Sequence, residues 1–263
     1  MGIIRKNRNN LVGNLLNELL RQNWDPGDGL KFDNVDDYVI LGDVLSLVNN
    51  RTFSAICTIT ENFNIGKSAT IISRSLAESR EYFFGVITEA TVFYIQVQSN
   101  NSVSGYDTVY AGPIPYRAKP YHLAASQTGT RVKCYLDGVY LPVFSGSETF
   151  STISSLPNHI AYVGKLLGTN PYRFKDIIFD LKVFNKGLTD NEILYLYNTQ
   201  CQMIPPTAIT NCVLDIRFED KQGLTSKDIS GNGYNGALTG FTGTTLGVTN
   251  AWVNKYGSSI QVL

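Results

Sequence analysis

The chain has 263 residues, 43% of them hydrophobic and 17% charged, and its 22 basic side chains balance 22 acidic ones. The length accommodates one large domain with appended segments. The formal net charge of zero gives no reason to expect nucleic acid as a partner. No stretch reaches the ~18 apolar residues of a membrane span, so no membrane partner is expected either. The 15 Tyr, 13 Phe and 23 Gly favour an all-β chain with frequent turns.

Residues 1–28 are predicted to form an N-terminal helical arm. Apolar residues recur there at spacings of one, three and four, which places them on one face of an amphipathic helix. They include Leu11, Leu15, Leu16, Leu19 and Leu20. Polar residues interrupt this segment, so it is not a signal-peptide core, and we expect the chain to fold in a cytoplasm. Two interpretations stay open: the arm packs on its own domain, or it anchors the protein to a partner.

A hairpin is predicted in the middle of the chain. Val132, Cys134 and Leu136 alternate with polar residues, as in a strand with one buried face. The pair Asp137-Gly138 then tolerates the positive φ angles of a tight turn, and the alternation resumes at Val139. Such a pair between two alternating segments is a strong signal for two antiparallel strands.

Further short strands are predicted at 36–41, 53–60, 69–74, 81–87, 91–98, 121–126, 159–163 and 176–184. In the last of these, Phe179, Leu181 and Val183 are expected to share one face. Regular spacing of short strands is typical of a β-sandwich. The sandwich is expected to span residues 29–204.

One short helix is predicted near 189–199. Thr189-Asp-Asn-Glu192 is a capping box, because the Thr side chain can accept from the third amide while the Glu reaches back. Ile193, Leu194, Leu196 and Tyr197 are expected to supply its buried face. A final segment, residues 205–263, begins at the pair Pro205-Pro206.

The four cysteines fall into two groups. Cys57 and Cys134 lie inside apolar alternating segments, which favours buried free thiols. Cys201 and Cys212 flank a Pro-containing linker, so they are either free or paired if the linker folds back.

Four motifs together resemble the laminin-G-like (concanavalin A-like) jelly-roll family. They are Phe32-Asp-Asn-Val-Asp-Asp-Tyr-Val39, Tyr135-Leu-Asp-Gly-Val139, the stretch from Phe174 to Ile193, and Ser230-Gly-Asn-Gly233. The resemblance implies an all-β fold, an antiparallel β-sandwich jelly roll. The last motif normally opens the module, whereas here it comes at the end. The segment 205–263 is therefore expected to complete a sandwich, either its own or that of a neighbouring copy.

The resemblance also implies a calcium site near the Ser-Gly-Asn-Gly turn. Asp228, Asn232 and Asn235 would supply oxygens, with Asp180 from the preceding long strand. The alternative is a turn that its own backbone hydrogen bonds hold, without a metal. No other cofactor is expected.

Exposed aromatic residues suggest where a sugar would bind. Tyr106, Tyr110, Tyr116, Tyr172 and Arg173 lie in aromatic-rich segments and could stack on sugar rings or donate to hydroxyl groups. The alternative is that these side chains cover the rim of the sandwich or an interface between copies, where Tyr and Arg are enriched.

No catalytic residues are predicted, so the protein is not expected to be an enzyme. A glycosidase needs two suitably placed carboxylates, and no strand carries alternating acids of that kind. His122 and His159 are the two histidines, and neither has an evident nucleophile or metal-ligand partner nearby in the sequence.

The resemblance implies a non-enzymatic structural role in a tailed-phage virion, as a head decoration, head fibre or tail-attachment protein. The arm would anchor the protein to other virion proteins, and the jelly roll would face outward in a homo-oligomer. The alternative is a carbohydrate-binding module for a host-surface or other polysaccharide. A glycan hydrolase is the third hypothesis.

Overall fold

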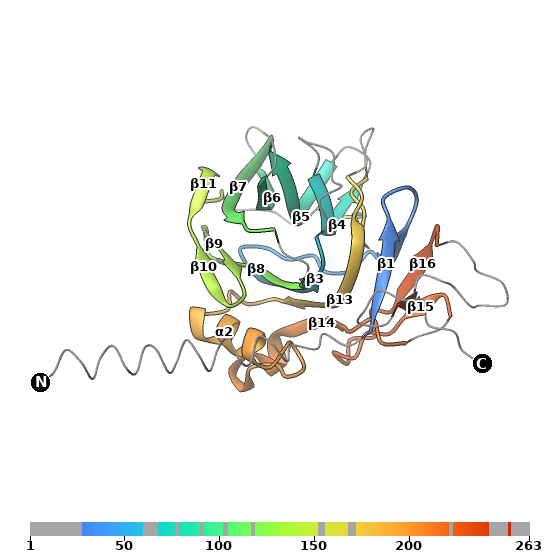
Figure 1. The fold of residues 1–263 in the computed structure, drawn as a ribbon. Helices are drawn as coiled ribbons and strands as arrows, with labels where there is room; N and C mark the ends of the chain where they lie inside the picture. The colour runs from blue at the N-terminus through green and yellow to red at the C-terminus, as the bar shows by residue number, and fades with distance from the viewer. Residues whose placement is uncertain are drawn as a thin grey trace, which may run out of the picture.

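Two antiparallel β-sheets lie face to face, and a helical layer covers one of them (Figure 1). The computed structural model describes residues 28–59, 68–76, 79–89, 92–101, 105–116, 119–151, 156–167, 172–220, 223–241 and 252–253. The predicted all-β sandwich is confirmed. In this part of the chain, no helix has the length and apolar character needed to cross a membrane. The arm residues Leu11, Leu15, Leu16, Leu19 and Leu20 lie outside the described residues.

The first sheet has eight strands in the order β10-β9-β8-β3-β13-β1-β17, with β14 also paired to β13. Its strands are β1 (Gly29–Asp33), β3 (Asn50–Cys57), β8 (Tyr121–Thr128), β9 (Arg131–Leu136), β10 (Val139–Leu141), β13 (Lys175–Phe184), β14 (Cys212–Ile216) and β17 (Trp252–Val253). The predicted hairpin is the pair β9–β10, in which Leu136 lies opposite Val139.

The second sheet has nine strands in the order β11-β7-β6-β5-β4-β12-β2-β16-β15. Its strands are β2 (Tyr38–Gly42), β4 (Ser68–Leu76), β5 (Ser79–Glu89), β6 (Val92–Asn101), β7 (Gly105–Ile114), β11 (Val143–Gly146), β12 (Ile160–Val163), β15 (Thr225–Ser226) and β16 (Gly236–Thr239).

The main hydrophobic core fills the space between the two sheets. Alternation along each strand sends every second side chain inward, such as Ile95 and Val97 on β6. Phe53 on β3 and Phe84 on β5 stack across the core, with ring centroids 5.7 Å apart. Burying one such side chain contributes roughly 1.5–3 kcal/mol.

A second core lies on the opposite side of the eight-stranded sheet. The helix α2 (Asp190–Asn198) and the 3-10 helix η1 (Pro206–Asn211) pack there, with Ile193, Leu196 and Ala208 among the buried residues. The capping box is confirmed: the Glu192 amide donates to Thr189 Oγ1, and the Thr189 amide donates to Glu192 Oε2. Leu194 was expected in the buried face but is 40% exposed, because the sheet covers only one side of α2.

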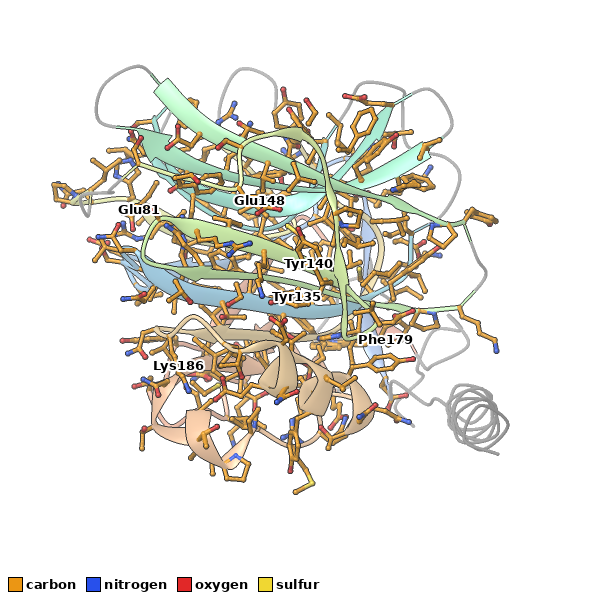
Figure 2. All side chains as sticks on the ribbon, turned by 90° about the vertical axis from the view of Figure 1, so that its left-hand side faces the viewer. Glu81, Tyr135, Tyr140, Glu148, Phe179 and Lys186 are labelled. Carbon is orange, nitrogen blue, oxygen red and sulfur yellow. The ribbon has the colours of Figure 1, made fainter. Side chains whose placement is uncertain are left out.

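The prediction that Phe179, Leu181 and Val183 share one face is wrong. The register of β13 against β3 shifts between Ile178 and Asp180, which is a β-bulge. Phe179 therefore packs in the second core, whereas Leu181 and Val183 pack in the main core. Figure 2 shows the layers edge on, with Phe179 near the junction of sheet and helix.

The segment after residue 205 supplies strands to both sheets. β14 pairs with β13, β17 pairs with β1, and β16 pairs with β2, so all three meet strands of the same chain. Exchange of the segment between neighbouring copies stays a prediction about the protein in solution. All four cysteines are buried and free. Of the two alternatives for Cys201 and Cys212, the structure therefore has the free thiols and not the disulfide.

Candidate functional site

One sheet face is left without a helical cover. In the described part of the chain, α2 and η1 both pack on the eight-stranded sheet, away from β4, β5, β6 and β7 (Figure 1). Because Ile95 and Val97 point into the core, Gln96 and Gln98 on β6 point to the outer side of the nine-stranded sheet. We call this outer side the tyrosine face. It is defined by Tyr38, Arg80, Gln96, Gln98, Tyr106, Tyr110, Tyr162, Lys165, Tyr172 and Arg173.

Arg80 is the centre of a first cluster on this face. Its guanidinium carbon lies 5.1 Å from the ring centroid of Tyr106 and 5.7 Å from that of Tyr172, within the range of cation–π attraction. Arg80 Nη1 donates to Gln98 Oε1 at 2.8 Å, and Gln98 Nε2 donates to Thr108 Oγ1 at 3.3 Å. The amide therefore fixes the guanidinium beside the two rings.

Tyr38 is the centre of a second cluster. Its ring meets that of Tyr162 edge to face, with centroids 6.0 Å apart. Lys165 Nζ lies 3.8 Å from the Tyr38 centroid, and the Arg173 guanidinium carbon lies 5.9 Å from it. An isolated β-bridge between Lys165 and Arg173 holds the two segments together. Two cations thus share one tyrosine.

Within the described residues, the three cations of the tyrosine face form no ion pair with an acid. These cations are Arg80, Lys165 and Arg173. Burial and the charge of Arg173 lower the pKa of Lys165. Arg80 Nε and Arg173 Nη1 are buried and have no hydrogen-bond partner. An unmet buried donor costs roughly 1–3 kcal/mol.

Four of the five predicted sugar-binding residues lie on the tyrosine face. Tyr106 and Tyr172 meet at Arg80, and Arg173 belongs to the cluster around Tyr38. Tyr110 Oη accepts from Gln96 Nε2 at 3.4 Å. The fifth, Tyr116, is 50% exposed, and no described contact joins it to the others.

Sequence reasoning missed Tyr38, Arg80, Tyr162 and Lys165. The alternation of Tyr38 with the buried Val39 and Leu41 is a signal that would have placed its ring on an outer face. No comparable signal exists for Arg80 or Lys165, because their contacts cross strands that are distant in the sequence.

Three of the four residues of the predicted calcium site, Asp228, Asn232 and Asn235, form hydrogen bonds within or beside the turn. Asp228 accepts from the backbone amides of Asp215, Ser230 and Tyr234 and from the Ser230 hydroxyl, which uses both of its carboxylate oxygens. Asn235 Oδ1 accepts from the Asp228 amide, and Asn232 Nδ2 donates to the Val213 carbonyl. Side chains thus hold this turn to the backbone, whereas the alternative interpretation expected backbone hydrogen bonds alone.

Asp180 does not join that turn, because its Oδ2 accepts from Lys182 Nζ at 2.8 Å within the layer under α2. Calcium takes six to eight oxygen ligands, and the four predicted residues do not gather such a set. A different group of carboxylates does converge, at the turn between β1 and β2. Oxygens of Asp33, Asp36 and Asp37 lie within 4.8 Å of one another.

Replacing Asp37 with Asn is expected to stabilise the protein above neutral pH. Burial and the charges of Asp33 and Asp36 raise the pKa of Asp37 to about 7. The native state thus holds a proton that the unfolded chain releases near pH 4, so stability falls as the pH rises from about 4 to about 7. We expect the variant to melt ~2–4 °C higher than the parent at pH 8, and the gain to be smaller at pH 5. Thermal unfolding at both pH values measures this, and an equal gain at both would contradict it.

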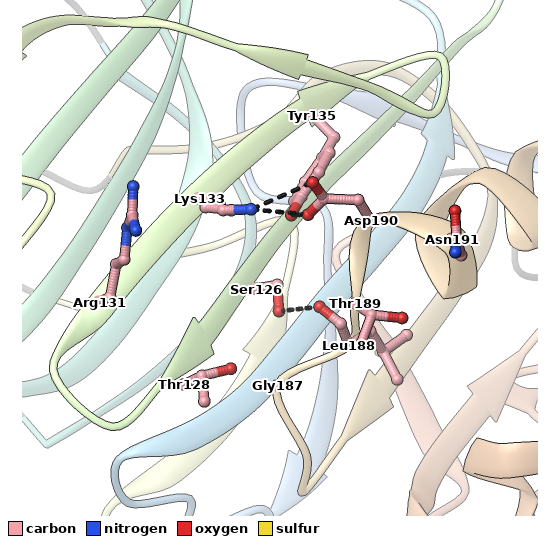
Figure 3. Close-up of a pocket in the computed structure, with 10 residues that line it drawn as sticks. All are labelled: Ser126, Thr128, Arg131, Lys133, Tyr135, Gly187, Leu188, Thr189, Asp190 and Asn191. Carbon is pink, nitrogen blue, oxygen red and sulfur yellow. Dashed lines mark hydrogen bonds and ion pairs between the residues drawn. The ribbon is translucent and has the colours of Figure 1, made fainter.

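A separate pocket of about 560 Å³ lies between the eight-stranded sheet and the start of α2 (Figure 3). Its polar groups pair with one another. Asp190 Oδ1 accepts from Lys133 Nζ and from Tyr135 Oη, both at 2.8 Å, and Ser126 Oγ donates to the Leu188 carbonyl. These groups are already satisfied, in contrast to the guanidinium groups of the tyrosine face.

His122 lies beside a hydroxyl group in the structure, although no such group is near it in the sequence. His122 Nε2 lies 2.9 Å from Ser54 Oγ, because β8 pairs with β3 in a register that sequence alone does not give. Cys201 Sγ lies 3.7 Å from the same hydroxyl. His122 is fully buried, and burial lowers its pKa to about 4. The group is therefore a neutral hydrogen-bonded pair under the helix, with no access for a substrate.

Comparisons with known proteins agree with the architecture. No protein-family model matches the chain, and no curated protein shows a significant match to its sequence. Solved structures do match. A putative carbohydrate binding protein from Bacteroides ovatus aligns with a TM-score of 0.60 at 16% identity, over 82% of this chain and 59% of that one.

A heptameric SAP-like pentraxin from Limulus polyphemus aligns with a TM-score of 0.52 at 13% identity, over 65% of this chain and 82% of that one. At these identities the likenesses establish a shared fold, the lectin-like jelly-roll sandwich. The chain spans about three fifths of the Bacteroides protein's length.

Proposed function

We propose that the protein is a carbohydrate-binding module whose ligand lies on the tyrosine face. The observation that carries the proposal is the pair of tyrosine–cation clusters on the one sheet face that no described helix covers. Tyrosine rings offer flat apolar surface to the C–H face of a sugar, while guanidinium and amide groups donate to its oxygens. The fold likeness to a protein described as putatively carbohydrate binding supports the proposal.

The spacing of the two clusters favours an oligosaccharide over a single sugar. Arg80 lies on β5 and Tyr38 on β2, with β4 and β12 between them. Three strand spacings amount to ~14 Å across the sheet, and the strand register sets the two residues apart along the strands as well. A chain of sugars laid diagonally over the strands would contact both clusters, and a monosaccharide would contact only one.

In this proposal the tyrosine face binds a glycan and does not hydrolyse it. Glycoside hydrolysis uses two carboxylates that flank the scissile bond. The ten residues that define the tyrosine face include no Asp or Glu. The face can therefore hold and orient a glycan, and its ten defining residues include no pair of acids to cleave one.

Replacing Tyr172 with Ala is expected to weaken glycan binding about tenfold. The change removes a ring that stacks on the ligand and flanks Arg80, and a tenfold loss corresponds to about 1.4 kcal/mol. A glycan array identifies the ligand, and titration calorimetry then compares the variants. Tyr140→Ala is the matched control, since Tyr140 is an exposed tyrosine on β10 of the other sheet.

Two outcomes would contradict the proposed function. One is an array on which the folded protein binds no glycan at all. The other is an unchanged affinity of Tyr172→Ala for a glycan that the parent protein binds, because this would place the ligand elsewhere.

The virion role stays a prediction from the sequence. It rests on the family resemblance and on the arm at residues 1–28, whose first 27 residues lie outside the described ones. Three further points are likewise predictions from the sequence. They are assembly with other virion proteins, homo-oligomer formation and location in a phage particle. A glycan-binding face accords with a particle that attaches to a cell surface, and equally with a module that acts apart from one.

A further inference from the structure

We propose that the tyrosine face selects acidic oligosaccharides and that Arg80 and Arg173 receive carboxylate groups of the glycan. This inference rests on the proposed carbohydrate binding and names its ligand class. The structure points to it through an excess of unpaired positive charge on a surface that is otherwise apolar and amide-bearing.

The excess is local, because the chain as a whole has a formal net charge of zero. Six cations elsewhere in the described residues have acidic partners, whereas others, such as Lys31 and Lys175, form no ion pair with a described residue. Lys133 pairs with Asp190, Lys186 pairs with Glu192, and Arg74 pairs with Asp43 and Glu81. On the tyrosine face, three cations stand together without one. A surface of this kind is complementary to an anion.

The tyrosine rings position the cations without neutralising them. The negative face of an aromatic ring attracts a guanidinium or ammonium group, but it carries no net charge. Arg80 can therefore stay fixed beside Tyr106 and Tyr172 and keep its full charge for a ligand. The same holds for Lys165 and Arg173 beside Tyr38.

Charge decides between a neutral and an acidic ligand. The guanidinium fork of an arginine matches the two oxygens of a carboxylate. A hydroxyl group would accept one hydrogen bond but leave the charge unpaired. A carboxylate satisfies both the donor and the charge.

One acid lies near an end of this face. It is Glu89, at the opposite end of β5 from Arg80. Burial raises the pKa of Tyr110, and the charge of Glu89 raises it further. Its charge would repel an acidic sugar placed over Tyr110. The carboxylate positions are therefore assigned to Arg80 and Arg173, and not to the region of Tyr110.

The test uses matched pairs of glycans that differ only in charge. The probes are an oligogalacturonate, an oligoguluronate, a hyaluronan hexasaccharide and sialyllactose, each beside its carboxyl methyl ester, together with a heparin tetrasaccharide as a sulfated probe. We expect at least one acid form to bind at least about tenfold more tightly than its ester. Its affinity should fall as salt is raised, because charged contacts are screened.

Variants then locate the charge recognition. Arg80→Gln and Arg173→Gln should each lower the affinity for the acid form about tenfold and leave the weaker affinity for the ester unchanged. Arg80→Lys keeps the charge but loses the fork, so its affinity should fall between those of the parent and Arg80→Gln. Arg131→Gln is the matched control, because Arg131 is an exposed arginine on the other sheet. Melting curves establish that each variant is folded.

The possible failures separate the two proposals. Equal binding of acid and ester, or of neutral glycans alone, would overturn the acidic ligand class and leave carbohydrate binding standing. Tighter binding of the sulfated probe than of every carboxylated one would overturn the assignment to carboxylates. Absence of binding to all glycans, neutral and acidic, would overturn both proposals.

Discussion

Replacing Lys182 with Met is expected to lower the free energy of unfolding by about 3–5 kcal/mol. Lys182 is fully buried, and its Nζ lies 2.8 Å from Asp180 Oδ2 and 2.6 Å from Asp215 Oδ1. Without the ammonium group, two carboxylates would remain together in a site that excludes water. Burial already raises the pKa of Asp180 to about 7 in the intact protein, so this site tolerates little more negative charge.

Chemical unfolding at pH 7, followed by Trp fluorescence, measures the loss. Asp180→Asn is the matched control, because it leaves one cation beside one carboxylate and is expected to cost far less. The destabilisation of Lys182→Met should shrink on lowering the pH to 5, where the native state of the variant takes up protons that relieve the repulsion. A loss below ~1 kcal/mol at pH 7 would contradict the view that Lys182, together with Asp180 and Asp215, stabilises this part of the fold.

Replacing Trp252 with Ala is expected to cost about 3–5 kcal/mol. Trp252 is fully buried in the main core and lies opposite Leu30 in the pairing of β17 with β1. Its indole Nε1 also donates to the Gly223 carbonyl at 3.2 Å. The change therefore opens a large cavity and removes the donor to the half-buried Gly223 carbonyl, where β17 pairs with β1.

Denaturant titrations at several protein concentrations test both the size of the effect and the source of the strand. If the segment after residue 205 completes its own sandwich, the midpoint is independent of concentration. An exchanged dimer gives a midpoint that rises with concentration. Leu224→Ala is the control, since Leu224 is 43% exposed beside Gly223. An effect of Trp252→Ala no larger than that of the control would place β17 outside the stable fold.

The fold was largely predictable, and its exceptions have physical reasons. Alternation located most strands, and the motif at Thr189 located α2, because both signals are local. The bulge at Phe179 was not predictable, since it depends on how β13 aligns with β3. The burial of Leu194 was predicted from helical spacing, but the position of the sheet relative to α2 decides which side of the helix is covered.

The candidate site was predictable only in part. Tyr106 and Tyr172 stood out as aromatic residues in polar loops, but nothing in the sequence joined them. Arg80 lies 26 residues before Tyr106 and on a different strand. Its guanidinium contacts the Tyr106 ring, and its backbone amide donates to Tyr106 Oη. The close approach of His122 to Ser54 was missed for the same reason, because strand register brings them together across 68 residues.

The late position of β14, β16 and β17 shapes how the chain folds during synthesis. When the ribosome has made residues 1–204, β1 and β2 each still lack one neighbouring strand, which β17 and β16 supply afterwards. Until then both sheets present open edges, which are templates for pairing with other chains. An unfinished copy would thus be prone to aggregate, so interrupted translation would be more damaging here than in a jelly roll whose opening strands emerge first.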